Sequence, residues 1–190
     1  MSTAASLSPT ITNMIRMDHS HVLMLFRRFK PKTSIARKSA IVTNACLALE
    51  IHAQLEEEIF YPALQRLATG ASEVDKSVPE HDEVRRIIAE LRQMQPGQAE
   101  FDTTFRKLIR VVLHHVADEE TVLLPLAEER LGNELRELGG QMTKRRLELL
   151  RPQAGLAVRT AMASFPLASA MVALGAVIFG FALLGNSRER

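Results

Sequence analysis

Apolar residues recur at alternating spacings of three and four along the first two thirds of the chain, which is the pattern of amphipathic α-helices. Turn signals at Pro31, Thr69-Gly70 and Pro96-Gly97 separate four such stretches, and Gly132 follows the last. Short connections make neighbouring helices antiparallel. The pattern therefore predicts an all-α fold, an up-down-up-down four-helix bundle over residues 1–131.

Capping patterns predict where each helix begins. Ser8-Pro9 suits the start of the first helix, with proline at the first helical position, and the second helix is expected to start at residues 33–34. The stretch 77–80 (Ser-Val-Pro-Glu) is a capping-box pattern, so we expect a loop over 68–76 and the third helix after it. The fourth helix is expected to run from about 98 to 131.

The remainder of the chain has a different pattern. Residues 132–150 form a shorter amphipathic stretch, which we expect Gly139-Gly140 to break, within a basic segment over 132–159. No charged residue lies between Arg159 and Arg188, and about twenty apolar residues are enough to span a bilayer. We therefore expect a C-terminal transmembrane helix over 160–187, in preference to an apolar helix buried in a dimer.

Charges beside the apolar segment predict its orientation. Basic residues exceed acidic ones on the bundle side, which predicts a single-pass C-terminal anchor with the bundle on the cytoplasmic side of the membrane. The small-residue pair Ala176-x-x-x-Gly180 is compatible with a membrane partner or a homo-oligomer. The net charge of +2 gives no indication of a nucleic-acid partner. The single cysteine, Cys46, excludes an intrachain disulfide and lies in an apolar stretch typical of a core.

The two halves of the predicted bundle resemble each other. Asp18-His19 in the first half corresponds to Glu80-His81 in the second, and His52-x-x-x-Glu56-Glu57 corresponds to His115-x-x-x-Glu119-Glu120. A proline follows each of the longer motifs. This helix-pair duplication predicts that the four histidines are related by a pseudo-two-fold axis.

Helical phase separates inward from outward polar residues. A set of four histidines and two glutamates lies on the apolar stripes: His19, His52, Glu56, His81, His115 and Glu119. A second set is out of phase and expected to be exposed: His21, Glu57, Glu58, His114 and Glu120. Buried imidazoles and carboxylates without partners would cost several kcal/mol. Metal ions satisfy them, so the inward set predicts a metal site.

The ligand types narrow the choice of metal. Imidazoles and carboxylates without a thiolate favour iron, with manganese less favoured, over structural zinc. Two carboxylates suit bridging between two cations that each hold two histidines. Asp18 and Glu80, beside ligand histidines, are either acceptors for imidazole N–H groups or solvated charges.

Together these motifs, with Tyr61-Pro62 and Pro125, resemble the hemerythrin-like, or HHE cation-binding, family over about residues 9–131. The resemblance implies a non-haem di-iron centre that meets O2, peroxide or nitric oxide. It implies that His19 and His52 hold one iron, that His81 and His115 hold the other, and that Glu56 and Glu119 bridge them.

The sequence departs from the oxygen-carrying members in the third helix, which offers only His81 where the carriers have two histidines one turn apart. This departure argues against reversible oxygen transport. Arg85, one turn beyond His81, either faces the site and stabilises a developing anion or is a solvated surface residue. Three functions stay open: a module that binds or senses a small ligand, a peroxidase-, catalase- or oxidase-like di-iron enzyme, and a metal-free interaction bundle.

Overall fold

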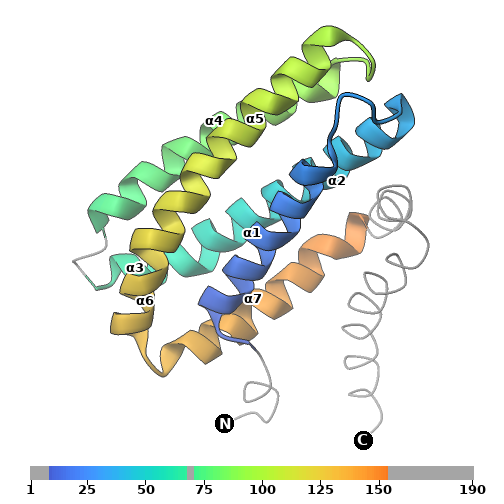
Figure 1. The fold of residues 1–190 in the computed structure, drawn as a ribbon. Coiled ribbons are helices and arrows are strands. Elements are labelled where there is room, and N and C mark those ends of the chain that lie inside the picture. The colour runs from blue at the N-terminus through green and yellow to red at the C-terminus, as the bar shows by residue number, and fades with distance from the viewer. Residues whose placement is uncertain (1–8, 68–70, 154–190) are drawn as a thin grey trace, which may run out of the picture.

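The computed structural model describes residues 9–67 and 71–153. In this part of the chain the four long bundle helices are α1 (Ile11–Arg28), α2 (Ile35–Leu55), α4 (Ala71–Gln93) and α5 (Ala99–Asp118). Helix α1 runs antiparallel to α2, and α4 runs antiparallel to α5 (Figure 1). The predicted all-helical, up-down-up-down bundle is confirmed.

Each of the first two helices begins directly after an N-cap residue with an extended backbone. Thr10 caps α1 and its Oγ1 accepts a hydrogen bond from the backbone N–H of Asn13 at 3.3 Å. The hydroxyl satisfies an N–H group that has no partner within the helix. The predicted start at Ser8-Pro9 is therefore two residues too early, whereas the start of α2 after Ser34 is as predicted.

Helix α4 begins earlier than its capping pattern predicts. It is already helical at Ala71, and Pro79 lies inside it. The predicted helix start at Ser77 is wrong, and so is the predicted loop over residues 71–76. Val74 is fully buried in the core and Ser77 is 5% exposed, so tertiary packing outweighs the local capping pattern.

Two helices pass through a π-helical turn. Helix α2 continues through η1 (Glu56–Phe60) into α3 (Tyr61–Gln65), and the N–H of Tyr61 bonds to the carbonyl of Glu56, five residues earlier. Pro62 follows at once, and a proline inside a regular α-helix lacks an N–H and clashes with the carbonyl four residues back. The wider turn accommodates the proline without ending the helix.

The same arrangement recurs in the second half. Helix α5 continues through η2 (Glu119–Leu123) into α6 (Leu124–Leu131), and the N–H of Leu124 bonds to the carbonyl of Glu119. Each π turn thus begins at one of the two inward glutamates. The helix then ends at Gly132, which has a positive φ of 45°.

A fifth helix, α7 (Glu134–Leu150), packs along α1 and α2, and a short 3-10 turn, η3 (Arg151–Gln153), comes after it (Figure 1). The predicted break at Gly139-Gly140 is wrong, because α7 continues through both residues. A Cβ at Gly139 would lie 2.0 Å from the carbonyl oxygen of Pro9. The glycine therefore permits a close approach to the start of α1 instead of ending a helix.

Two apolar clusters fill the bundle on either side of a polar layer. In α1, Ile11 and Ile15 before His19 belong to one cluster, and Val22 and Phe26 after it belong to the other. The second of these clusters holds Cys46, which is buried as predicted, and the ring pairs that Phe26 and Phe29 form with Phe105. The first cluster extends under α7 through Leu135, Leu138 and Met142. Packing on both sides holds the polar layer rigidly.

The predicted membrane location is corrected by the structure. Within residues 9–67 and 71–153, no helix is both long and apolar enough to cross a bilayer, and the segment 160–187 lies outside the described residues. The prediction of a membrane anchor with the bundle on its cytoplasmic side is wrong on this finding. Two basic residues on which it rested pair with the bundle itself, Arg145 with Glu58 and Arg146 with Asp18.

Candidate metal centre

Six polar side chains meet in the layer between the two apolar clusters. The four histidines come one from each of α1, α2, α4 and α5, and the two glutamates are the first residues of η1 and η2. All six are at most 5% exposed: His19, His52, Glu56, His81, His115 and Glu119. The structure thus brings together the set that helical phase selected.

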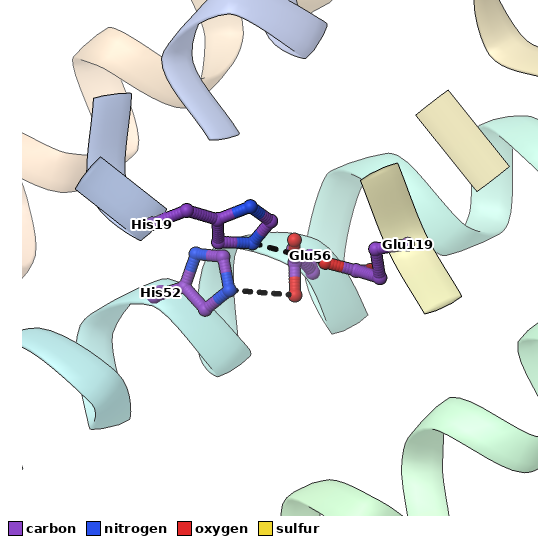
Figure 2. Close-up of side chains that lie close together, drawn as sticks. All are labelled: His19, His52, Glu56 and Glu119. Atoms are coloured by element: carbon purple, nitrogen blue, oxygen red, sulfur yellow. Dashed lines mark ion pairs between the residues drawn. The ribbon is translucent and has the colours of Figure 1, made fainter. Parts of the chain in front are cut away.

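The first group of candidate ligands consists of His19 from α1, His52 from α2 and the glutamates that begin the two π turns (Figure 2). His19 Nε2 lies 3.2 Å from Glu119 Oε2, and His52 Nε2 lies 3.3 Å from Glu56 Oε2. One ligand atom from each of these four residues lies within 4.8 Å of the others. This spacing suits one cation.

The second group shares a glutamate with the first. His81 Nε2 lies 3.4 Å from Glu56 Oε2, and His115 Nε2 lies 3.5 Å from Glu119 Oε2. The two imidazole Nε2 atoms lie 3.1 Å apart. Glu56 belongs to both groups and Glu119 approaches histidines of both, so the geometry suits two neighbouring cations with shared carboxylates.

Contacts among the candidate ligands do not satisfy all of their polar atoms, whereas bound metal ions would. Four buried ligand atoms form no well-aligned hydrogen bond within the described part of the chain: His19 Nε2, His52 Nε2, Glu56 Oε1 and Glu119 Oε2. Buried polar atoms without partners are costly, and divalent cations satisfy such atoms. Nitrogen and carboxylate oxygen donors are those of iron and manganese. The only cysteine, Cys46, lies in the apolar core, where burial raises the pKa of its thiol to about 12.

A second set of carboxylates surrounds the imidazoles. The Nδ1 atoms of His19, His81 and His115 each lie 2.9 Å from a carboxylate oxygen, and that of His52 lies 3.5 Å from one. The three shorter contacts are hydrogen bonds that orient their rings with Nε2 towards the centre, whereas His52 Nδ1 forms no well-aligned hydrogen bond with Asp18. The outer acids are, in the same order, Glu120, Glu57, Glu80 and Asp18.

The outer acids correct two expectations. Glu57 and Glu120 were expected to be exposed; Glu120 is exposed and Glu57 is half-buried, but each also contacts a histidine of a neighbouring helix. Asp18 and Glu80 were candidates for contacts with imidazole N–H groups, and each contacts a histidine on the next helix instead of its sequence neighbour. The repeated Glu-Glu pair in each half was the available signal for Glu57 and Glu120.

Tyr61 is a further residue of the centre that helical phase did not select. Its hydroxyl donates to Glu119 Oε1 at 2.9 Å and lies 3.3 Å from Glu56 Oε2 and 3.4 Å from His81 Nε2. Burial, together with the nearby Glu56 and Glu119, raises the pKa of Tyr61 above its usual range. The hydroxyl therefore keeps its proton beside the candidate ligands. Its place directly after η1 links it to the ligand motif.

The electrostatics show why the centre favours cations. Burial and the nearby Glu119 raise the pKa of Glu56 well above its usual range. Burial also opposes ionisation of Glu119, but the nearby His19, His115 and His52 lower its pKa to about 2. Burial and the nearby His115 lower the pKa of His81 to about 4. The two core carboxyl groups repel each other when both are ionised, and a cation placed between them relieves this repulsion.

The remaining predicted candidates lie away from the ligand atoms. Arg85 Nη2 lies 2.6 Å from both oxygens of Glu57, so it braces an outer acid and neither faces the centre nor is simply solvated. The side chain of His114 is 71% exposed and 3.9 Å from Asp118, as predicted for an outward residue. His21 is half-buried and belongs to neither ligand group.

A small cavity adjoins the centre. Its volume is about 20 Å³, which is room for one molecule of the size of water. The cavity is lined by the four candidate ligand histidines, by Asp18 and by apolar residues, among them Val22, Leu49, Val84 and Val112. These four residues lie three positions from the histidine of their helix, so the cavity follows the pseudo-two-fold symmetry.

Comparison with known proteins agrees with this geometry. A solved structure of a hemerythrin HHE cation binding domain-containing protein from Mycobacterium kansasii shares the fold, with a TM-score of 0.66 and 22% identity over 80% of this chain and 93% of that chain. A DNA nickase from Nostoc sp. is 28% identical over 124 residues, which are 65% of this chain and 35% of the nickase. The chain thus spans about a third of that relative. Residues 10–127 match the family model of the hemerythrin HHE cation binding domain, and the protein therefore belongs to this family.

Proposed function

We propose that this protein binds two iron ions, one held by His19 and His52 and the other by His81 and His115, with Glu56 and Glu119 bridging them. The observation that carries the proposal is the pair of buried ligand groups that share a glutamate. The donor set suits iron, with manganese as the less favoured alternative. A metal-free interaction bundle is disfavoured, because it would bury these groups without adequate partners.

We further propose that the loaded centre binds or reacts with O2, peroxide or nitric oxide. When bound, the iron ions supply a redox couple and positions for a small ligand. A cavity of about 20 Å³ beside the candidate ligands offers room for a small ligand. The protein therefore handles or senses a small oxidising or gaseous ligand.

A second candidate function is a peroxide- or O2-reducing enzyme at the same centre. It is favoured by Tyr61, whose hydroxyl donates a hydrogen bond to Glu119 Oε1 at 2.9 Å and so places a hydrogen-bond donor beside the candidate ligands. It is also favoured by α4, which offers one histidine to the centre, with Arg85 turned to Glu57 instead. We do not extend DNA nicking to this chain, because most of that relative lies outside the match.

Metal content tests the proposed centre. The full chain, loaded with Fe(II) under anaerobic conditions and desalted, is expected to keep two irons, measured by elemental analysis. His52→Ala and His115→Ala each remove a ligand of one position and should lower the iron content sharply. His114→Ala, on the outer face of the same helix as His115, should keep both irons. Full iron content in His52→Ala and His115→Ala would rule out the assignment.

Reactivity separates a carrier from a redox protein. We expect the reduced, iron-loaded protein to be oxidised quickly by O2, or to consume added peroxide over many turnovers, as followed by visible absorption and peroxide assay. Tyr61→Phe, which removes only the hydroxyl, should slow this oxidation or peroxide consumption while iron content stays the same. A band that forms with O2 and disappears reversibly on deoxygenation would instead support a carrier.

A further inference from the structure

A single arginine connects the fifth helix to the candidate metal centre. Arg146 of α7 places Nη1 2.5 Å from Asp18 Oδ1 and Nη2 2.6 Å from Asp18 Oδ2. The Arg146 side chain is 26% exposed and that of Asp18 is 16% exposed. Such a two-point contact between a planar guanidinium and a carboxylate fixes the orientation of the carboxylate as well as its position.

Asp18 in turn contacts a candidate ligand. Its Oδ2 lies 3.5 Å from His52 Nδ1, and His52 Nε2 lies 3.3 Å from Glu56. This is the longest of the four contacts between an outer acid and an imidazole; the equivalent contact in the other half, between Glu80 and His115, is 2.9 Å. His52 Nδ1 forms no well-aligned hydrogen bond, so Asp18 acts on this ring through its position and its charge.

We propose that Arg146 is a positioning residue for the metal centre, acting through Asp18 to orient His52, so that the metal position formed by His19 and His52 depends on the docking of α7. The inference rests on the proposed function and adds a regulatory element to it. Coupling of this kind is reciprocal. Whatever displaces α7 weakens this metal position, and metal bound there strengthens the docking of α7.

The chain offers two matched controls. Arg145, the neighbour of Arg146, pairs with Glu58 at 2.6 Å, so it also fastens α7 to the bundle, but Glu58 belongs to neither ligand group. Arg85 braces Glu57 behind His81, which is the same role for the other metal position, exerted from within the bundle.

The test is an anaerobic titration of the full-length, metal-free protein with Fe(II), and with Co(II) as an optical probe, to obtain the number and affinity of bound ions. In Arg146→Gln we expect one of two ions to bind about tenfold to a hundredfold more weakly, as is typical when a partner behind a ligand is removed. Arg145→Gln should bind both ions as the wild type does. Arg146→Lys, which offers a single point of contact, should restore only part of the affinity.

A His81→Ala background identifies which position is affected. With one ligand of the second position removed, Arg146→Gln should abolish most of the remaining binding, whereas Arg85→Gln should leave it unchanged. Far-ultraviolet circular dichroism checks that each variant is folded, and Asp18→Asn tests the same contact from α1 if Arg146→Gln does not fold.

The outcomes are distinct. If the wild-type protein binds no metal, the proposed function fails. If the wild type binds two ions and Arg146→Gln does so with unchanged affinities, the inference alone is overturned. Equal losses in Arg145→Gln and Arg146→Gln would also overturn it, because general docking of α7, and not the contact with Asp18, would then be the cause.

Discussion

Each inward histidine lies between two carboxylates, a core glutamate near Nε2 and an outer acid near Nδ1. For His19 these distances are 3.2 Å to Glu119 and 2.9 Å to Glu120. An outer acid that accepts the Nδ1 proton leaves the Nε2 lone pair facing the centre, which is the form that binds a metal. The paired acids therefore set both the orientation and the protonation of each ring.

The low pKa of His81 predicts a pH effect on the metal-free protein. Its folded pKa of about 4 lies below the ordinary value of 6.5, so between these values the unfolded chain binds the proton more strongly. The contribution of His81 to the free energy of unfolding is complete above pH 6.5 and is lost as the pH falls to 4, by about 3 kcal/mol. Urea unfolding of the metal-free protein at several pH values measures it.

The variant His81→Gln isolates this contribution. Glu56 and His19 have raised pKa values and act in the opposite direction, so the wild-type curve alone does not report on His81. The free energy of unfolding of the wild type minus that of His81→Gln should decrease from pH 7 to pH 4. A difference that does not change with pH would contradict the low pKa of His81.

Helical phase identifies the six inner residues because each regular helix places its own inner residues on its apolar stripe. It does not identify the partners of those residues. Glu57 and Glu120 directly follow an inner glutamate within a π turn, where the regular phase no longer holds, and each reaches a histidine on another helix. Asp18 is next to His19 in sequence but contacts His52, because that choice depends on how the helices pack.

At the scale of the element, the π turns and α7 are the features that local patterns missed. The prolines after the ligand motifs are visible in the sequence. The sequence does not show that the helix continues past each proline through a wider turn, because this depends on the backbone geometry. The glycine pair in α7 predicted a break, and close packing on α1 explains Gly139 instead. Local preference was overridden by tertiary contact in both α4 and α7.

Gly139→Ala tests the packing of α7 on α1. In an ordinary exposed helix this change stabilises, because alanine favours the helix more than glycine does. Here the added Cβ would meet the Pro9 carbonyl oxygen at 2.0 Å, so α7 or the start of α1 must shift. We expect a net loss of about 1–3 kcal/mol in the free energy of unfolding, measured by urea titration. Glu137→Ala, on the exposed face of the same helix, should change stability little.

An equal or higher stability of Gly139→Ala would show that α7 does not approach α1 so closely. Because Arg146 lies two turns further along α7, a displaced helix should also weaken the metal position at His52. Metal titration of Gly139→Ala would then resemble that of Arg146→Gln.

At the scale of the whole molecule, the pseudo-two-fold symmetry is real but incomplete. The duplicated motifs predicted equivalent halves, and the ligands, π turns and outer acids follow that symmetry. Helix α7 breaks it, because it packs mainly along α1 and α2 and no equivalent helix packs along α4 and α5 in the described part of the chain. Its basic and apolar residues resembled a segment beside a membrane, and only the packed structure shows that they contact the bundle.

Truncation distinguishes the part of the chain that the bundle requires from the part that it does not. A chain that ends after Gln153 keeps all ligands, all outer acids and α7, so we expect it to fold and to bind two irons. A chain that ends after Gly132 exposes the apolar surface under α7 and loses Arg146. Each of Leu135, Leu138 and Met142 contributes about 1.5–3 kcal/mol of burial, so the shorter chain should melt at a clearly lower temperature.

Metal binding shows whether the shorter chain is only less stable or has lost a specific position. Since His81 and His115 make no contact with α7 in the described part of the chain, we expect the chain that ends after Gly132 to keep one iron at a temperature well below its melting transition. Circular dichroism and elemental analysis on the same sample measure folding and iron content together. Two tightly bound irons in this chain would show that the first position does not need α7, whereas none in the chain that ends after Gln153 would place a required element in residues 154–190.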